Sequence, residues 1–147
     1  MTEHPNILLV EDNEDDVILV QRSLRKAGIT APIHVVRDGD KAIVYLEEAS
    51  QPLRRPECLP AVVLLDLKLP RRSGLEVLAW IRSHPSLATL PVVIFTTSAQ
   101  DSDVREAYAL GANSYLQKPV GIHETTEVLK ATGLYWLTHN VRPPATT

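Results

Sequence analysis

The fold of this 147-residue chain is decided by two stretches, Ile7-Leu8-Leu9-Val10-Glu11-Asp12 and Val62-Val63-Leu64-Leu65-Asp66. Each begins with an unbroken apolar run, which is typical of a strand buried on both faces of a parallel sheet. Each run is followed directly by acidic residues. Because ligands bind beyond the carboxyl ends of such strands, these carboxylates predict a place for a hard divalent cation at one sheet edge.

Strand-like and helix-like segments alternate along the rest of the chain. Further strands are predicted over 32–36, 91–95 and 113–116, and the strand that precedes Asp66 begins at Ala61. Apolar residues at helical spacing predict the intervening helices: Val17, Val20, Leu24 and Ala27; Ala42, Ile43 and Leu46; Val77, Leu78 and Ile81; Val104, Ala107, Tyr108 and Gly111. A last helix is predicted over 122–137.

Capping and turn residues set the expected limits of these elements. Gly28 ends the first helix, and Ser73-Gly74 opens the third. Asp101 or Ser102 is the expected N-cap of the fourth. Residues 47–60 contain three prolines and are expected to form a surface loop. The chain is therefore predicted to be an α/β protein with five βα units.

Right-handed crossovers between such units give a doubly wound sheet with helices on both faces. The predicted fold is flavodoxin-like, (βα)5, with a five-stranded parallel sheet in the order 2-1-3-4-5. In this order the first and third strands are neighbours, so Glu11, Asp12 and Asp66 meet at the topological switch point. Carboxylates gathered there repel one another unless a cation or a proton compensates, and Mg²⁺ suits all-oxygen ligands.

Composition excludes several classes of function. A net charge of −3 and a pI near 5.9 provide no basic field for nucleic-acid binding. The single cysteine, Cys58, allows no intramolecular disulfide, which favours a reducing compartment. The N-terminus does not resemble a signal peptide, and no apolar run approaches the roughly 18–20 residues of a membrane span. A cytoplasmic location is expected.

Hydroxyl and ammonium groups follow the last two predicted strands. Thr96, Thr97 and Ser98 lie just past the fourth strand, and Lys118-Pro119 follows the fifth. A lysine at the same edge as three carboxylates can pair with Asp66 or with a phosphoryl oxygen. A cis bond before Pro119 would turn Lys118 inward. Taken singly, each of these motifs is also consistent with a solvated loop or an ordinary turn.

Together the motifs resemble the receiver domain of two-component response regulators. The residues that carry the resemblance are Val10-Glu11-Asp12-Asn13, Leu65-Asp66-Leu67-Lys68-Leu69-Pro70, Gly74, Thr96, Tyr115 and Lys118-Pro119. The likeness covers about 6–137. The Asp-Leu-Lys-Leu-Pro and Thr-Thr-Ser variants and the closing Tyr135-Trp136-Leu137 are similar to the phytochrome-associated single-domain regulators.

The resemblance implies a chemistry for these residues. Asp66 would be the phosphoacceptor, attacking a phosphohistidine on a sensor histidine kinase, which could be a bacterial phytochrome. Asp12, Asp66 and the main-chain carbonyl of Lys68 would bind Mg²⁺, with Glu11 acting through a water molecule. Lys118 and the Thr96 hydroxyl would hold the phosphoryl oxygens. The protein would be a signalling phosphoacceptor that assists its own phosphorylation and dephosphorylation, and not an enzyme.

The same resemblance implies a switch. Movement of Thr96 toward Asp66 would vacate space into which the Tyr115 ring turns, and the face made by the fourth helix, fifth strand and fifth helix would change. Outside the motif, Tyr115 would be an ordinary half-buried strand aromatic. Lys68 and Ser98 occupy positions where side chains usually tune phosphoaspartate hydrolysis, and the bulk of Thr97 could narrow access to Asp66.

The end of the chain bears on partners. The resemblance assigns residues 1–138 to the receiver domain and 139–147 to a tail without an output domain, so direct DNA binding is not expected. The preceding residues are apolar around the whole helix: Leu134, Tyr135, Trp136 and Leu137. This pattern fits either a tightly tucked helix or a homodimer surface that the tail crosses, and the homodimer is favoured.

Two other functions fit parts of the pattern. A flavodoxin-like Mg²⁺-dependent phosphohydrolase also uses an aspartate nucleophile, but such enzymes typically carry a second aspartate two residues later, where this chain has Lys68. A receiver-like scaffold that is never phosphorylated is disfavoured because Asp12, Asp66, Thr96 and Lys118 are all present. Phosphoryl signalling is therefore the preferred function.

Overall fold

A five-stranded parallel sheet forms the centre of the molecule. The computed structural model describes residues 5–51 and 59–144; residues 52–58 of the predicted 47–60 loop, which include Cys58, and the last three tail residues lie outside this range. The strands are β1 (Ile7–Val10), β2 (Ile33–Val36), β3 (Val62–Leu65), β4 (Val92–Thr96) and β5 (Ser114–Gln117). Their order is β2-β1-β3-β4-β5, which confirms the predicted flavodoxin-like topology.

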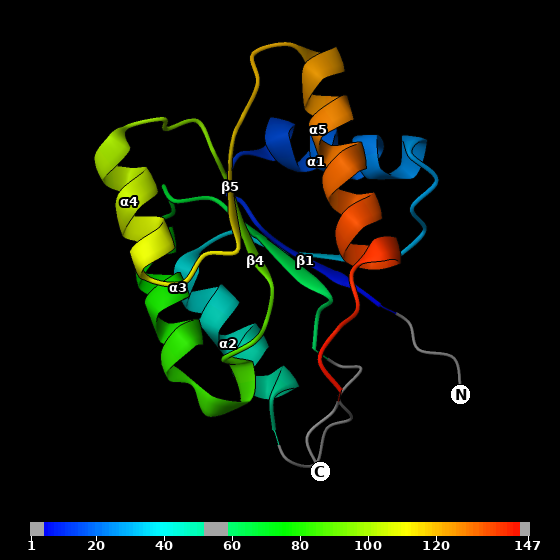
Figure 1. Ribbon diagram of the computed structural model, residues 1–147. Helices are drawn as coiled ribbons and strands as arrows, with labels where there is room; N and C mark the ends of the chain where they lie inside the picture. The colour runs from blue at the N-terminus through cyan, green and yellow to red at the C-terminus, as the bar shows by residue number, and fades with distance from the viewer. Residues whose placement is uncertain (1–4, 52–58, 145–147) are drawn as a thin grey trace.

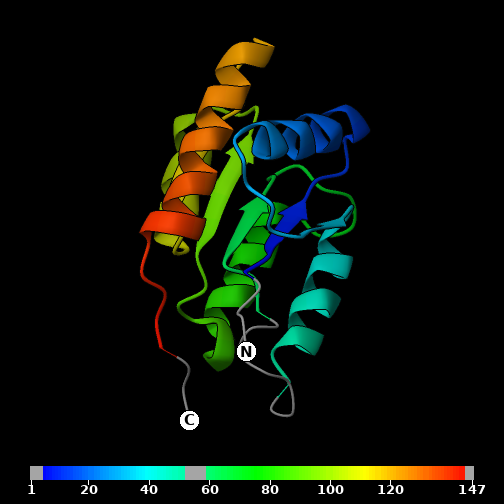
Figure 2. The same cartoon turned by 90° about the vertical axis from the view of Figure 1, so that its right-hand side faces the viewer.

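Helices cover both faces of this sheet. They are α1 (Glu14–Lys26), α2 (Gly39–Ala49), α3 (Gly74–Ser83), α4 (Asp101–Ala109) and α5 (Ile122–Leu134), followed by a π-helical turn at Tyr135–His139. In Figure 1, α1 and α5 lie to the right of the sheet, and α2, α3 and α4 lie to the left. Figure 2 shows α1 and α5 packed side by side over one face.

The alternation of strand side chains explains these two helical layers. Leu8, Val63 and Ile94 face the layer of α2, α3 and α4, whereas Ile7, Val62 and Val93 face α1 and α5. All of these side chains are buried. The continuous apolar runs of the sequence are therefore needed, because every strand residue in the centre of the sheet contacts a helix. None of the described helices is long and apolar enough to cross a membrane.

Several predicted boundaries were wrong. Helix α2 continues through Ala49, because Glu47-Glu48-Ala49 consists of good helix formers and the loop begins only after it. β4 extends to Thr96. The N-cap of α4 is Gln100 and not Asp101 or Ser102, and its side chain makes no capping bond. Ser98 Oγ accepts from the Gln100 N–H at 3.3 Å, so a residue upstream satisfies the N–H of the N-cap residue.

Smaller differences concern the strand starts and the last helix. β2, β3, β4 and β5 each begin one residue later than predicted, after Pro32, Ala61, Pro91 and Asn113, and β5 ends one residue later, at Gln117. The last helix changes from α to π geometry after Leu134 and ends at His139. Ser73 is the expected cap of α3: it forms a capping box with Glu76, in which each side chain accepts from the other's backbone N–H.

Candidate functional site

The register of the central strands brings Glu11 and Asp66 side by side. Val10 pairs with Leu65 across β1 and β3, so the next residue of each strand lies at the same level of the sheet edge. The Asp66 N–H donates to the Val10 carbonyl oxygen at 3.1 Å. Glu11 is only 1% exposed and Asp66 7%. Two buried carboxylates at neighbouring strand ends are unusual, because ionised side chains are rarely buried without partners.

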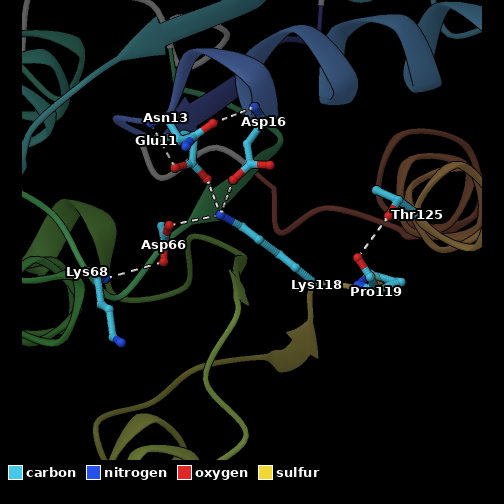
Figure 3. A network of polar contacts seen from close by, with 8 residues as sticks. All are labelled: Glu11, Asn13, Asp16, Asp66, Lys68, Lys118, Pro119 and Thr125. Carbon is cyan, nitrogen blue, oxygen red and sulfur yellow. Dashed lines mark hydrogen bonds and ion pairs between the residues drawn. The ribbon is translucent and has the colours of Figure 1, made fainter. Parts of the chain in front are cut away.

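The partner of both carboxylates is Lys118, as Figure 3 shows. Its Nζ lies 2.6 Å from Glu11 Oε1 and 3.0 Å from Asp66 Oδ2. A third bond, at 2.8 Å, goes to Asp16 Oδ2 in the first turn of α1. The Lys118 N–H donates to the Thr96 carbonyl oxygen at 2.7 Å, which continues the β4–β5 pairing to the sheet edge. The described residues contain no cis peptide bond, and Lys118 points inward with a trans bond to Pro119.

Burial dominates the electrostatics of this pocket. It raises the pKa of Glu11 from 4.5 to about 7, with the Lys118 hydrogen bond opposing the shift and the charge of Asp66 adding to it. For Lys118, burial alone lowers the pKa, but its hydrogen bonds to Asp16, Glu11 and Asp66 outweigh burial and the net pKa is raised. The ammonium group is therefore charged at any physiological pH.

An oxygen-rich cluster suits a metal ion at the same edge. One carboxylate oxygen each from Glu11, Asp12 and Asp66 lies within 4.8 Å of the others, and Asp12 is the exposed member. All three are hard oxygen donors, the type that Mg²⁺ and Mn²⁺ prefer. Asp66 Oδ1 accepts from the Lys68 N–H at 3.3 Å, and this bond restrains the orientation of the Asp66 carboxylate. The donor set fits a divalent cation.

Gly74 allows the loop after β3 to fold tightly around Asp66. A Cβ at this position would lie 2.1 Å from the Asp66 carbonyl oxygen, far inside contact distance. The Gly74 N–H donates to the Leu67 carbonyl oxygen at 2.8 Å. Within this loop Arg71 takes a left-handed conformation, with φ at 70°. The N-terminus of α3 therefore packs directly against the backbone of the candidate phosphoacceptor, which only glycine permits.

The two predicted switch residues lie on adjacent strands. Thr96 is fully buried, and its Oγ1 has no hydrogen-bond partner among the described residues. The Tyr115 ring packs inward against the core, and its hydroxyl donates to the Ser98 carbonyl oxygen at 2.9 Å. Burial raises the pKa of Tyr115, and the bond to Ser98 opposes the shift. The switch role of Tyr115 stays a prediction, because the predicted inward turn of the ring follows phosphorylation.

Two contacts were not predicted from the sequence. Asp16 joins the pocket although no sequence motif gave it a role; its position in the first helical turn after Asp12 is the only signal that could have indicated it. Ser98 Oγ donates to Asp103 Oδ2 at 2.5 Å, so this side chain is turned toward α4. Thr97, whose bulk was expected to narrow access to Asp66, is exposed.

The candidate dimer residues divide into two groups. Trp136 and Leu137 are partly buried and pack against the core layer of α1 and α5, as a tucked helix predicts. Tyr135 is 50% exposed and meets Trp136 edge-on, with ring centroids 4.9 Å apart. Leu134 is half-buried. Only Tyr135 of the four therefore presents a largely exposed apolar surface to a partner.

Known proteins share both the sequence and the fold. The model of the response regulator receiver domain family matches residues 7–130. The chain is 37% identical over 139 residues to the response regulator Rcp1 of Synechocystis sp., covering 95% of this chain and 93% of the relative. It is 41% identical over 137 residues to the "Probable methanogenesis regulatory protein FilR2" of Methanothrix harundinacea, covering 93% and 86%.

Solved structures agree with these relatives. The phosphorylated cyanobacterial phytochrome response regulator RcpA superposes with a TM-score of 0.85 at 35% identity, covering 96% of this chain and 99% of that one. The Mn²⁺-bound form of Rcp1 superposes with a TM-score of 0.83 at 35% identity, covering 95% and 99%. The similarity therefore extends over nearly the full length of each chain.

Proposed function

Because this chain belongs to the response regulator receiver domain family, we propose that it accepts a phosphoryl group on Asp66 from a sensor histidine kinase. The observation that carries the proposal is the contact of Lys118 Nζ with Asp66 Oδ2 at 3.0 Å, beside a cluster of oxygen ligands. Phosphoryl transfer needs a buried nucleophile, a cation against it and a free donor, here the Thr96 hydroxyl, which has no partner within residues 5–51 and 59–144.

The transfer itself requires one bond to form and one to break. A carboxylate oxygen of Asp66 bonds to phosphorus as the phosphorus–nitrogen bond of the donor phosphohistidine breaks, and the leaving imidazole takes up a proton from solvent. The product is an acyl phosphate. The Lys118 ammonium N–H that donates to Asp66 in this structure then donates to a phosphoryl oxygen, and the Thr96 hydroxyl donates to another phosphoryl oxygen. Most of the catalysis consists of positioning and charge neutralisation.

A divalent cation, Mg²⁺ in the cell, belongs to this proposal. Asp12, Asp66 and the main-chain carbonyl of Lys68 would hold it, and Glu11 would act through a water molecule. When bound, the ion would reduce the electrostatic repulsion between the Asp66 carboxylate and the incoming phosphoryl group, both of which are negatively charged. The cluster of oxygens within 4.8 Å supports this assignment, and so does the Mn²⁺ bound by the similar protein Rcp1.

The signal would leave the pocket through Thr96 and Tyr115. A bond from the Thr96 hydroxyl to the phosphoryl group would draw the end of β4 toward Asp66. Tyr115, held by the Ser98 carbonyl at 2.9 Å, would stabilise the accompanying position of the β4–α4 loop. The face of α4, β5 and α5 would then favour one of two arrangements, which a partner protein reads as a population shift.

The proposed partners follow from the relatives. The kinase would be of the phytochrome type, since RcpA is a phytochrome response regulator and is similar over nearly the whole chain. Residues 1–138 would form the receiver and 139–147 a tail at a homodimer contact that includes Tyr135. The pI near 5.9 supports a protein partner and gives no support to nucleic acid.

Phosphate transfer tests the proposal directly. Wild type, Asp66→Asn and Asp15→Asn would be offered acetyl phosphate or a phosphorylated histidine kinase, with and without Mg²⁺, and the products separated on a Phos-tag gel. Asp15 is the control because it is an exposed carboxylate close to the pocket and outside it. Label that requires both Mg²⁺ and Asp66 is expected. Equal label on Asp66→Asn, or none on wild type under any condition, would refute the proposal.

A further inference from the structure

The acidic pocket includes a carboxylate that lies outside the oxygen cluster. Asp16 comes from the first turn of α1, whereas Glu11 and Asp66 follow strands. Its Oδ2 lies 2.8 Å from Lys118 Nζ, closer than Asp66 Oδ2 at 3.0 Å. The Asp16 side chain is 31% exposed, against 8% for Lys118, so this network reaches the surface at Asp16. Asp16 is therefore a partly exposed partner of the buried Lys118 ammonium group.

The number of N–H donors on an ammonium group shows how Asp16 can act on Lys118. Lys118 has three N–H donors, and three carboxylates accept from it: Glu11, Asp16 and Asp66. Phosphorylation converts Asp66 from an anion to an acyl phosphate, so the donor aimed at Asp66 is the one that must pass to a phosphoryl oxygen. The bonds to Glu11 and Asp16 can both persist through the reaction. Two fixed bonds restrain the position of Nζ and the direction of its third N–H more tightly than one bond does.

The start of α1 places Asp16 for this contact. Asn13 caps the helix by accepting from the Asp16 N–H at 3.0 Å, which fixes the backbone that carries the carboxylate. Asn13 also donates its own N–H to Glu11 Oε2 at 3.1 Å. The two carboxylates that accept from Lys118 without reacting are therefore tied together through one capping residue, and the positive end of the helix stabilises the charge of Asp16.

We propose that Asp16 is a positioning residue for phosphoryl transfer, which holds the Lys118 ammonium group in the direction of the phosphoryl oxygen. The inference rests on the proposed function and adds a residue to it. Asp16 lies outside the oxygen cluster of Glu11, Asp12 and Asp66, and its carboxylate contacts Lys118, so it acts through Lys118. The α1 helix thereby contributes to the reaction, in addition to the strand ends.

Kinetics of phosphorylation by acetyl phosphate in saturating Mg²⁺ test the proposal. Asp16→Asn is expected to lower the rate about 5- to 10-fold, which is the difference between a charge-assisted hydrogen bond and the neutral one that asparagine can still accept. Asp16→Glu should recover part of the loss. Asp15→Asn removes the same charge from the same helical turn without touching Lys118, and should change the rate less than about 2-fold, as expected for an exposed charge. Equal effects of Asp16→Asn and Asp15→Asn would overturn the proposal.

A double-mutant cycle shows whether Asp16 acts through Lys118. In a Lys118→Met background, Asp16→Asn should cause no further fall in rate, because the group that it positions is absent. A further fall of the same 5- to 10-fold size would mean that Asp16 acts on another group, and would overturn the proposal. Thermal unfolding followed by circular dichroism identifies any variant that has lost its fold, and Asp16→Glu then replaces Asp16→Asn as the informative variant.

A readout that needs no phosphorylation separates this inference from the proposed function. The ammonium protons of a lysine with three acceptors exchange slowly with water, and ¹⁵N-labelled lysine makes the Lys118 signal visible by NMR. Asp16→Asn should speed this exchange and shift the signal, whereas Asp15→Asn should do neither. If wild type takes no phosphate but the Lys118 signal responds to Asp16→Asn, then Asp16 does restrain the Lys118 ammonium group and the proposed function fails. If the Lys118 signal does not respond to Asp16→Asn, the proposed positioning role of Asp16 is refuted.

Discussion

The strand-end pocket and the C-terminal turn differ in which side chains they bury: the pocket buries charged residues, and the turn exposes an aromatic one. In the pocket, Glu11 and Asp66 are charged residues that are 1% and 7% exposed. In the turn, Tyr135 is an apolar aromatic that is 50% exposed. The pocket tolerates buried charge because Lys118 lies within 3.0 Å of both carboxylates. Burial in this molecule thus follows from available partners as much as from residue type, and the two regions can be perturbed separately.

Removal of the pocket's cation should have the largest effect. Lys118→Met leaves Glu11 and Asp66 buried without their common partner, and breaking a buried ion pair costs about 3 to 5 kcal/mol. We expect a fall of that size in the free energy of unfolding in urea at pH 8 without metal. The control is Lys130→Met on exposed α5 surface, which should change stability by less than about 0.5 kcal/mol. Equal stability of the two variants would mean that the pocket does not depend on Lys118.

A methyl group at the tight turn should have the next largest effect. Gly74→Ala places a Cβ 2.1 Å from the Asp66 carbonyl oxygen, and relief of such overpacking costs about 2 to 3 kcal/mol. Because the displaced backbone belongs to Asp66, phosphorylation should slow as well. Gly28→Ala is the matched control: its φ of 83° carries a strain of about 1 kcal/mol, but no atom lies within 4 Å of its Cβ. Urea unfolding and acetyl phosphate kinetics on both variants check this; a slower reaction in Gly28→Ala would contradict it.

The pH dependence of stability should come from Glu11. Burial raises its pKa from 4.5 to about 7, so the folded state binds the proton more tightly than the unfolded chain does. This contribution to stability is complete below pH 4.5 and is lost as the pH rises through about 7. The shift corresponds to about 3 kcal/mol as an upper figure. Wild type should lose about 2 to 3 kcal/mol relative to Glu11→Gln between pH 5 and pH 8 in metal-free buffer.

Urea unfolding at the two pH values measures this difference. Added Mg²⁺ should restore stability to wild type at pH 8, because a cation at the cluster compensates the ionised carboxylates. Asp15→Asn serves as the control, since an exposed carboxylate should not alter the pH profile. Parallel profiles for wild type and Glu11→Gln would show that Glu11 does not titrate between these pH values.

The smallest effects belong to the C-terminal turn. Trp136→Ala removes a partly buried ring from the α1 and α5 layer and should cost about 2 kcal/mol, less than a fully buried tryptophan. Tyr135→Ala should cost less than about 0.5 kcal/mol, because the ring is half exposed. If the proposed homodimer uses Tyr135, this variant should weaken the dimer without loss of stability. Analytical ultracentrifugation at micromolar concentrations decides this, and wild type that remains a monomer would exclude the dimer.

Much of the fold could be predicted because its signals are local. The runs that end at Val10 and Leu65 identify central strands, and the periodicity of α1 and α3 identifies their buried faces. Right-handed crossovers then leave few possible strand orders. The end of α2 was misplaced although its helix formers are also a local signal, but the start of α4 had a different cause. Ser98 Oγ, in the preceding loop, accepts from the N–H of the N-cap residue Gln100, and a loop conformation depends on contacts that no local pattern encodes.

The candidate site divides in the same way. The sequence by itself determined that Glu11, Asp12, Asp66 and Lys118 follow strands and that Thr96 lies at a strand end, and parallel topology brings all these strand ends to one edge. Only the tertiary structure placed Asp16 against Lys118, 102 positions away, and packed Tyr115 inward onto the Ser98 carbonyl. Strand ends are brought together by backbone pairing, which the pattern predicts. Contacts between a helix and a strand end depend instead on how the helix packs, and burial, which shifts the pKa of Glu11, is a property of the whole assembled core.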